Sequence, residues 1–122
     1  MTARLLAAAL IAGALLTGCE TESIKVDSPA DEQGAQLFNE RCSGCHTLSA
    51  AATQGSKPEG QRSGGERTNG PNFNTRHVAK DDALFAIRNG GFSGAIMPAN
   101  IVVGEDADKV AAFLDKYSGS GD

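Results

Sequence analysis

The chain has no tryptophan, and only 5% of its 122 residues are aromatic. Its charge is mildly acidic, with a net charge of −4, and no run of Lys and Arg forms a basic stretch. Nucleic-acid-binding surfaces need basic patches, and single-strand binders also need aromatic platforms. These shortages argue against a nucleic-acid partner. Sulfur and imidazole are also scarce, with three cysteines, two methionines and two histidines.

Two of the cysteines stand in the stretch Cys42-Ser43-Gly44-Cys45-His46, which reads C-x-x-C-H. This pattern is the attachment signature of a c-type haem. Two thiols on one helical turn reach the two vinyl groups of a porphyrin, and the adjacent imidazole is held below the iron. A chain this short buries little apolar surface and needs a staple, which a covalent haem would supply.

Two other uses of the pair are less favoured. A redox dithiol is possible for any C-x-x-C, but no strand–helix–strand pattern surrounds this one. A zinc site completed by His46 and His77 is the second alternative. Adjacent Cys45 and His46 would have difficulty sharing one tetrahedral ion, and the separation to His77 is not a familiar zinc-finger spacing.

The N-terminus has the features of an export signal. Arg4 precedes an apolar run, residues 5–16, that is shorter than the roughly 20 residues needed to span a bilayer. The run ends at Leu16-Thr17-Gly18-Cys19, which resembles the lipobox of bacterial lipoproteins. We therefore predict a signal peptide over residues 1–18 and lipidation of Cys19. Ordinary cleavage nearby, leaving a spare thiol, is the alternative.

Export and the haem motif support each other, because bacteria attach c-type haem outside the cytoplasmic membrane. We predict a lipid-anchored protein on the outer side of that membrane or in the periplasm. Residues 19–28 are predicted to form a tether. The folded domain is expected over residues 29–118, with a tail at 119–122.

Capping signals and apolar periodicity predict an all-α domain with helices over about residues 29–41, 81–89 and 105–117. Ser28 suits the N-cap of the first helix, acidic residues would cap the second, and Gly90 suits its C-cap. Residues 48–70 show no apolar periodicity and no strand-like alternation. They are predicted to form a long polar loop inserted in the domain.

A helix with Gly34 and Phe38 on one face, leading into C-x-x-C-H, resembles the N-terminal helix of class I cytochromes c. The resemblance implies a small fold of about three main helices wrapped around one covalent haem c. It implies thioethers at Cys42 and Cys45 and iron ligation by His46. It also implies that the terminal helices cross, with Gly34 and Phe38 against Phe113 and Tyr117.

The segment Gly70-Pro71-Asn72-Phe73 is similar to the Gly-Pro-x-Leu segment of that family. The resemblance implies that the Pro71 carbonyl accepts a hydrogen bond from His46. Phe73 stands where the family usually has leucine, and the resemblance implies an apolar contact with the haem.

A count of the remaining methionines and histidines reduces the candidates for the second iron ligand to two. Met1 is lost with a signal peptide, which leaves Met97 as the only thioether and His77 as the only imidazole besides His46. Met97-Pro98 in a glycine-rich loop resembles the distal segment of class I cytochromes c. Met97 is therefore favoured over His77.

With His46 and Met97 bound, both axial positions of the iron would be filled. This favours a one-electron carrier over an enzyme, and no small-molecule substrate is expected. The expected partners are redox proteins such as an oxidase, a dehydrogenase or a quinol-oxidising complex. The alternative function is a haem peroxidase or gas sensor in which Met97 can be displaced.

Overall fold

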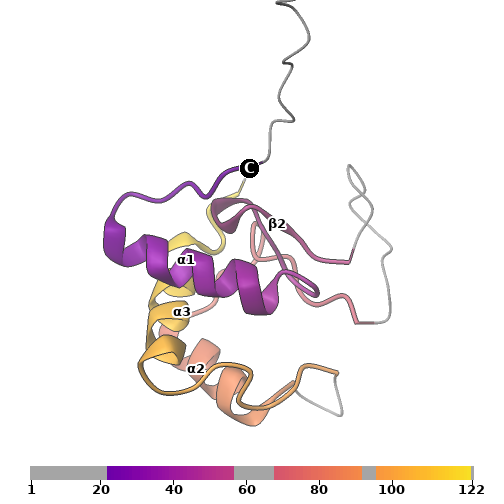
Figure 1. Ribbon diagram of the computed structural model, residues 1–122. Coiled ribbons are helices and arrows are strands. Elements are labelled where there is room, and N and C mark those ends of the chain that lie inside the picture. Colours follow the sequence, from indigo (N-terminus) through magenta and orange to yellow (C-terminus); the bar gives the residue numbers. More distant parts are fainter. Residues whose placement is uncertain (1–21, 57–67, 92–95, 122) are drawn as a thin grey trace, which may run out of the picture.

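The computed structural model describes residues 22–56, 68–91 and 96–121. Three α-helices dominate this part of the chain: α1 (Pro29–Cys42), α2 (Lys80–Asn89) and α3 (Gly104–Tyr117). α3 packs against both other helices (Figure 1). The predicted all-α class with three main helices is confirmed. The predicted signal peptide, Cys19 and residues 57–67 of the predicted loop lie outside the described residues. Among the described residues, no helix is long and apolar enough to cross a membrane.

The start of α1 is capped as its sequence predicts. Pro29 opens the helix, and the Ser28 hydroxyl accepts a hydrogen bond of 3.2 Å from the Asp31 backbone N–H. Lys116 and the Tyr117 hydroxyl, at the end of α3, also lie 2.6 Å and 3.0 Å from Asp31 Oδ2. The hydrogen bond from Lys116 is the main reason that the Asp31 pKa lies below its ordinary value. The first turn of α1 is thus bonded to the last turn of α3.

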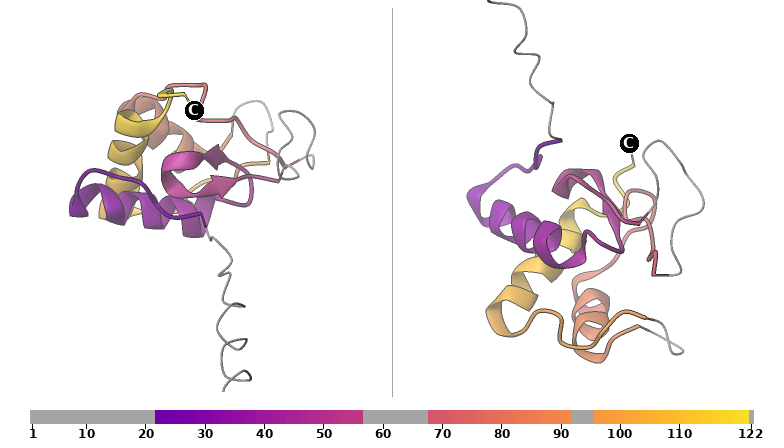
Figure 2. Two further views of the ribbon diagram at one scale, coloured as in Figure 1. Left: turned by 90° about the horizontal axis from the view of Figure 1, so that it is seen from above. Right: turned by 45° about the vertical axis from the view of Figure 1, so that its right-hand side comes forward.

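α1 and α3 cross (Figure 2), and Gly34 lies where α1 contacts α3. A Cβ at Gly34 would lie 2.6 Å from the Lys109 carbonyl oxygen and 2.7 Å from Phe113 Cβ. Beside this contact, the Phe113 ring centroid lies 5.9 Å from that of Phe38 and 5.2 Å from that of Tyr117. The predicted crossing of the terminal helices through these four residues is confirmed.

Gly34→Ala is expected to lower the free energy of unfolding by about 1–3 kcal/mol, the usual cost of an overpacked interface. The added methyl meets backbone of α3, so the two helices would have to separate. Guanidinium unfolding of the haem-containing protein measures this. Gly44→Ala is the matched control, because a Cβ at Gly44 meets nothing within 4 Å. Equal stability of the two variants would contradict the close crossing.

α2 starts one residue before its predicted acidic caps. Its N-cap is Ala79, which has no side-chain hydrogen bond, so the prediction of acidic capping was wrong. Asp81 and Asp82 instead lie in the first turn, near the positive end of the helix dipole. Gly90 is the C-cap as predicted, with φ +81° and its N–H donating to the Ala86 carbonyl.

Part of the predicted polar loop is a β-hairpin, which corrects the prediction for residues 48–54. Strand β1 (Thr47–Leu48) pairs with antiparallel strand β2 (Thr53–Gln54), and the 3₁₀ turn η1 (Ser49–Ala51) joins them. Leu48 is buried in the core. Thr53 Oγ1 accepts from the Leu48 N–H, and Asn39 Nδ2 donates to the Ala51 carbonyl at 2.8 Å. Side chains of the hairpin and of α1 therefore satisfy backbone groups of this stretch.

The chain before α1 also packs on the domain. Sequence predicts a tether over residues 19–28, but the structure holds residues 22–28 in place. Ile24 and Val26 pack against the core, and the Lys25 N–H donates to the Ala50 carbonyl at 2.9 Å. At the other end, the Gly119 N–H donates to the Phe73 carbonyl at 2.7 Å, so the predicted tail also begins in contact with the domain.

Candidate functional site

The C-x-x-C-H residues form one turn at the end of α1. The N–H groups of Cys45 and His46 both donate to the Cys42 carbonyl, at 3.1 Å and 2.9 Å. Both cysteines are free thiols. Burial raises the pKa of the Cys42 thiol to about 12, and the neighbouring Cys45 adds to the shift. Two thiols and an imidazole therefore stand on a single turn of backbone.

The imidazole of His46 is buried and held by one hydrogen bond. Its Nδ1 lies 3.1 Å from the Pro71 carbonyl oxygen, so Nδ1 carries the proton and Nε2 keeps its lone pair. Burial lowers the pKa of His46, and the Pro71 bond offsets only part of that shift. The ring is neutral, with Nε2 available to a metal. This donor set fits a haem joined by two thioethers and one axial nitrogen.

Gly70 approaches the His46 ring too closely for any side chain. A Cβ at Gly70 would lie 2.5 Å from His46 Cε1 and 2.7 Å from Nδ1. The Gly70 N–H also donates to the Cys45 carbonyl at 2.7 Å, which ties this segment to the C-x-x-C-H turn. Sequence reasoning assigned no role to Gly70. Its position directly before Pro71, the hydrogen-bond partner of His46, was the signal that could have revealed one.

Thr53 is a second residue that sequence reasoning missed. Its buried hydroxyl donates to the His46 carbonyl at 3.0 Å and accepts from the Leu48 N–H at 2.9 Å. The hairpin thereby holds the backbone of the histidine. No sequence signal pointed to this threonine, because it lies in a stretch of polar residues without periodicity.

Phenylalanine rings surround the imidazole. The Phe73 ring is stacked on His46, with centroids 4.7 Å apart and planes 14° apart. The Phe38 ring lies 6.3 Å from His46 and packs edge-on to Phe73 at 6.1 Å. Sequence predicts Phe73 as a haem contact, and the structure places its ring against the predicted ligand itself.

Met97 lies in a loop that is closed on the end of α2. Its carbonyl accepts from the Gly91 N–H at 3.0 Å, and the Asn100 N–H donates to the Ile87 carbonyl at 2.7 Å. The Met97 side chain is partly buried and packs against the hydrophobic core. Residues 92–95 of this loop lie outside the described residues.

His77, the alternative ligand, is bound at the end of α3. Its Nδ1 lies 3.3 Å from the Ser118 carbonyl oxygen, and its Nε2 lies 3.7 Å from Asp115 Oδ1. Within residues 22–56, 68–91 and 96–121, no three His, Cys, Asp or Glu side chains gather to hold a metal ion. The zinc site considered for Cys42, Cys45, His46 and His77 is therefore not assembled.

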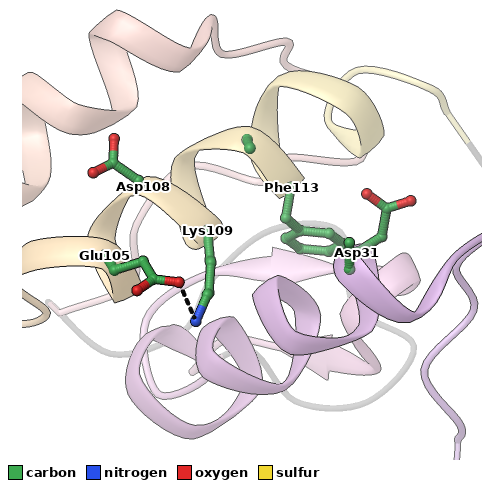
Figure 3. Close-up of a pocket in the computed structure, with 7 residues that line it drawn as sticks. Asp31, Glu105, Asp108, Lys109 and Phe113 are labelled. Carbon is green, nitrogen blue, oxygen red and sulfur yellow. Dashed lines mark ion pairs between the residues drawn. The ribbon is translucent and has the colours of Figure 1, made fainter.

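A separate depression of about 250 Å³ lies between α1 and α3. Phe113 forms part of its wall, and the Glu105–Lys109 ion pair of 3.1 Å lies beside it (Figure 3). Because the Phe38 ring packs between Phe113 and His46, this depression does not reach the imidazole. The C-x-x-C-H turn remains the candidate site.

Comparison with known proteins agrees with this geometry. Residues 32–118 match the cytochrome c family model. Among solved structures, the chain is similar to the c-type cytochrome SorU from Sinorhizobium meliloti, with 27% identity over 75% of this chain and 94% of that one, at a TM-score of 0.58. No curated protein matches the chain. The family match spans the C-x-x-C-H turn, α2, α3 and α1 from residue 32 onward, and the family binds haem c covalently. The chain belongs to the cytochrome c family, as a class I member.

Proposed function

We propose that this chain is a single-electron carrier with one haem c, joined to Cys42 and Cys45, whose iron is bound by His46 and Met97. Family membership supports electron transfer by a haem protein. The observation that carries the proposal is the 3.1 Å contact between His46 Nδ1 and the Pro71 carbonyl. It fixes the tautomer in which Nε2 is unprotonated and its lone pair can bind the iron. When bound, haem supplies an iron that changes its charge by one electron.

Met97 is proposed as the second ligand for two reasons. Its backbone is held at the C-terminal end of α2, and its side chain already faces the core. His77, by contrast, uses Nδ1 at Ser118 and places Nε2 near Asp115. A thioether favours ferrous iron, so His–Met ligation raises the reduction potential relative to two histidines.

The chain's own residues also prepare the site for fast electron exchange. His46 is held at three points. Its carbonyl accepts from Thr53, its Nδ1 contacts the Pro71 carbonyl, and its ring edge lies against Gly70. A ligand held on three sides moves little when the charge of its metal changes, which keeps the cost of reorganisation low. With His46 and Met97 bound to the iron, neither axial position would be open to a substrate. The proposed role is therefore electron transfer rather than catalysis.

Carbon monoxide tests the filled second position. The reduced wild-type protein is expected to show no spectral change when carbon monoxide is added, because Met97 occupies the iron. Met97→Leu is the matched variant, and it is expected to bind the gas on mixing. Fast binding by the wild-type protein, without unfolding, would contradict a simple carrier and favour the gas-sensor or peroxidase alternative.

We also propose that Cys19 carries a lipid that anchors the protein to the outer side of the cytoplasmic membrane, where redox proteins are its partners. Support comes from the lipobox-like Leu16-Thr17-Gly18-Cys19 and from the haem motif, which requires export. An oxidase, a dehydrogenase or a quinol-oxidising complex are the candidate partners. Their co-purification after detergent extraction would identify which one receives or supplies the electron.

Cys19→Ser is expected to move nearly all of the haem protein from the membrane fraction to the soluble fraction. Without the thiol, no diacylglycerol can be attached. Haem staining of both fractions measures the distribution. Ser23→Ala, a change of similar size just beyond the proposed lipidation site, is the control and should stay with the membrane. Full membrane retention of Cys19→Ser would contradict the anchor.

A further inference from the structure

Both backbone polar groups of Phe73 are hydrogen-bonded. Its N–H donates to the Thr47 carbonyl at 2.8 Å, and its carbonyl accepts from the Gly119 N–H at 2.7 Å. The first bond connects it to the hairpin beside the C-x-x-C-H turn, and the second connects it to the turn after α3. Its side chain is buried, at 8% exposure. The two backbone hydrogen bonds and the burial of the side chain therefore fix the orientation of the Phe73 ring.

That ring covers one face of the His46 imidazole. The centroid distance of 4.7 Å and the interplanar angle of 14° describe two nearly parallel, stacked rings. The Phe38 ring packs edge-on against Phe73, at 6.1 Å, and so backs the stack. A change in the plane of the imidazole would bring its edge into the Phe73 ring.

A single hydrogen bond does not fix the plane of an imidazole. The bond from Nδ1 to the Pro71 carbonyl fixes one ring atom but leaves the ring free to tilt about that contact. Gly70 limits movement at Cε1, because its backbone already lies close to that atom. Phe73 limits the tilt toward one face. These contacts together define one orientation of the ring.

We propose that Phe73 is a positioning residue that sets the plane of the His46 imidazole and lowers the reduction potential of the haem. The proposal rests on the proposed function, since His46 must be an iron ligand for its ring plane to matter. The leucine expected at this position from the family pattern supplies bulk but has no flat face. Phenylalanine supplies both.

The electrostatic part follows from the quadrupole of the benzene ring. The face of an aromatic ring is negative, and it attracts a cation that lies within about 6 Å. An imidazole bound to ferric iron carries more positive charge than one bound to ferrous iron. The stacked Phe73 face therefore stabilises the ferric state more than the ferrous state. Leucine has no such face, so its substitution is expected to raise the potential.

The test compares Phe73→Leu with Phe113→Leu in the haem-containing protein. Both changes remove a buried phenylalanine ring, but Phe113 reaches His46 only through Phe38. Phe73→Tyr, which keeps the stacked ring, is the conservative variant. The readouts are the midpoint potential and the hyperfine shifts of the haem methyl protons in the ferric state. Those shifts follow the orientation of the axial imidazole plane.

Phe73→Leu is expected to change the pattern of methyl shifts and to move the ferric–ferrous equilibrium about threefold toward ferrous. At 59 mV per tenfold for one electron, this is about 28 mV. Phe73→Tyr should restore both readouts toward wild type, and Phe113→Leu should leave both unchanged. Unchanged readouts in Phe73→Leu, or equal shifts in Phe73→Leu and Phe113→Leu, would overturn the proposal.

A separate variant tells failure of this proposal from failure of the proposed function. His46→Ala is expected to lose the low-spin spectrum of the wild-type haem. If that spectrum survives, His46 is not the ligand and the proposed function fails. If it is lost while Phe73→Leu behaves as wild type, His46 is the ligand and the positioning role of Phe73 alone is overturned.

Discussion

Replacing both Cys42 and Cys45 by alanine is expected to abolish covalent haem. The two thiols are the proposed attachment points in the C-x-x-C-H turn, and both are free in the structure. Because Cys42 ends α1 and the N–H of Cys45 bonds back to its carbonyl, their separation is set by the helix end. No other cysteine of the described residues could replace them. The expected loss is essentially complete.

Haem staining after denaturing electrophoresis measures this loss, because only covalent haem stays with the chain. Gly44→Ala, which lies inside the same motif but leaves both thiols in place, is the control and should retain the stain. A Cβ there meets nothing within 4 Å, so the turn is expected to tolerate it. Haem that remains with the double variant after denaturation would refute attachment at this turn.

The same variant is expected to lose much of its stability. The core of the described chain is small, and a domain of this size is marginal without a staple. The buried rings of Phe38 and Phe73 lie beside His46, and a haem held by this turn is expected to complete the core around them. We therefore expect the double variant to accumulate at a low level, measured by immunoblot against the Gly44→Ala control.

The predictions that succeeded concern positions where the local backbone geometry favours one residue type. Ser28 and Pro29 open α1 because an N-cap and a first helical position need those side chains. Gly34 marks the helix crossing because only glycine leaves room for the α3 backbone. Gly90 ends α2 with a positive φ. Such signals lie within a few residues of the structure they specify.

The predictions that failed depended on partners distant in sequence. The hairpin over residues 47–54 forms because Thr53 and Asn39 bond to backbone groups, which composition alone reads as loop polarity. Residues 22–28 pack on the domain through Ala50 and Tyr117, and the latter lies at the far end of the chain. Stacking of Phe73 on His46, about which the sequence made no prediction, also depends on how the segment after Pro71 returns to the C-x-x-C-H turn. No pattern in one stretch specifies such a return.

Met97→Leu is expected to lower the reduction potential by on the order of 0.2 V, within the ~0.8 V range that axial ligands span. The substitution keeps an apolar side chain of similar volume, so packing against the core should change little. The thioether that favours ferrous iron is lost. Water or an added ligand can then reach the iron. Potentiometry of the haem protein, followed by its visible spectrum, measures both effects.

His77→Ala is the control that decides between the two candidate ligands. His77 contacts the end of α3, where its Nδ1 lies 3.3 Å from the Ser118 carbonyl oxygen and its Nε2 lies 3.7 Å from Asp115 Oδ1. Its replacement is expected to leave the potential and the spectrum unchanged and to lower stability slightly. If Met97→Leu keeps the wild-type spectrum while His77→Ala loses it, the second ligand is His77. His77 would then have to leave its contacts with Ser118 and Asp115 when haem binds, so the turn at the end of α3 would have to open.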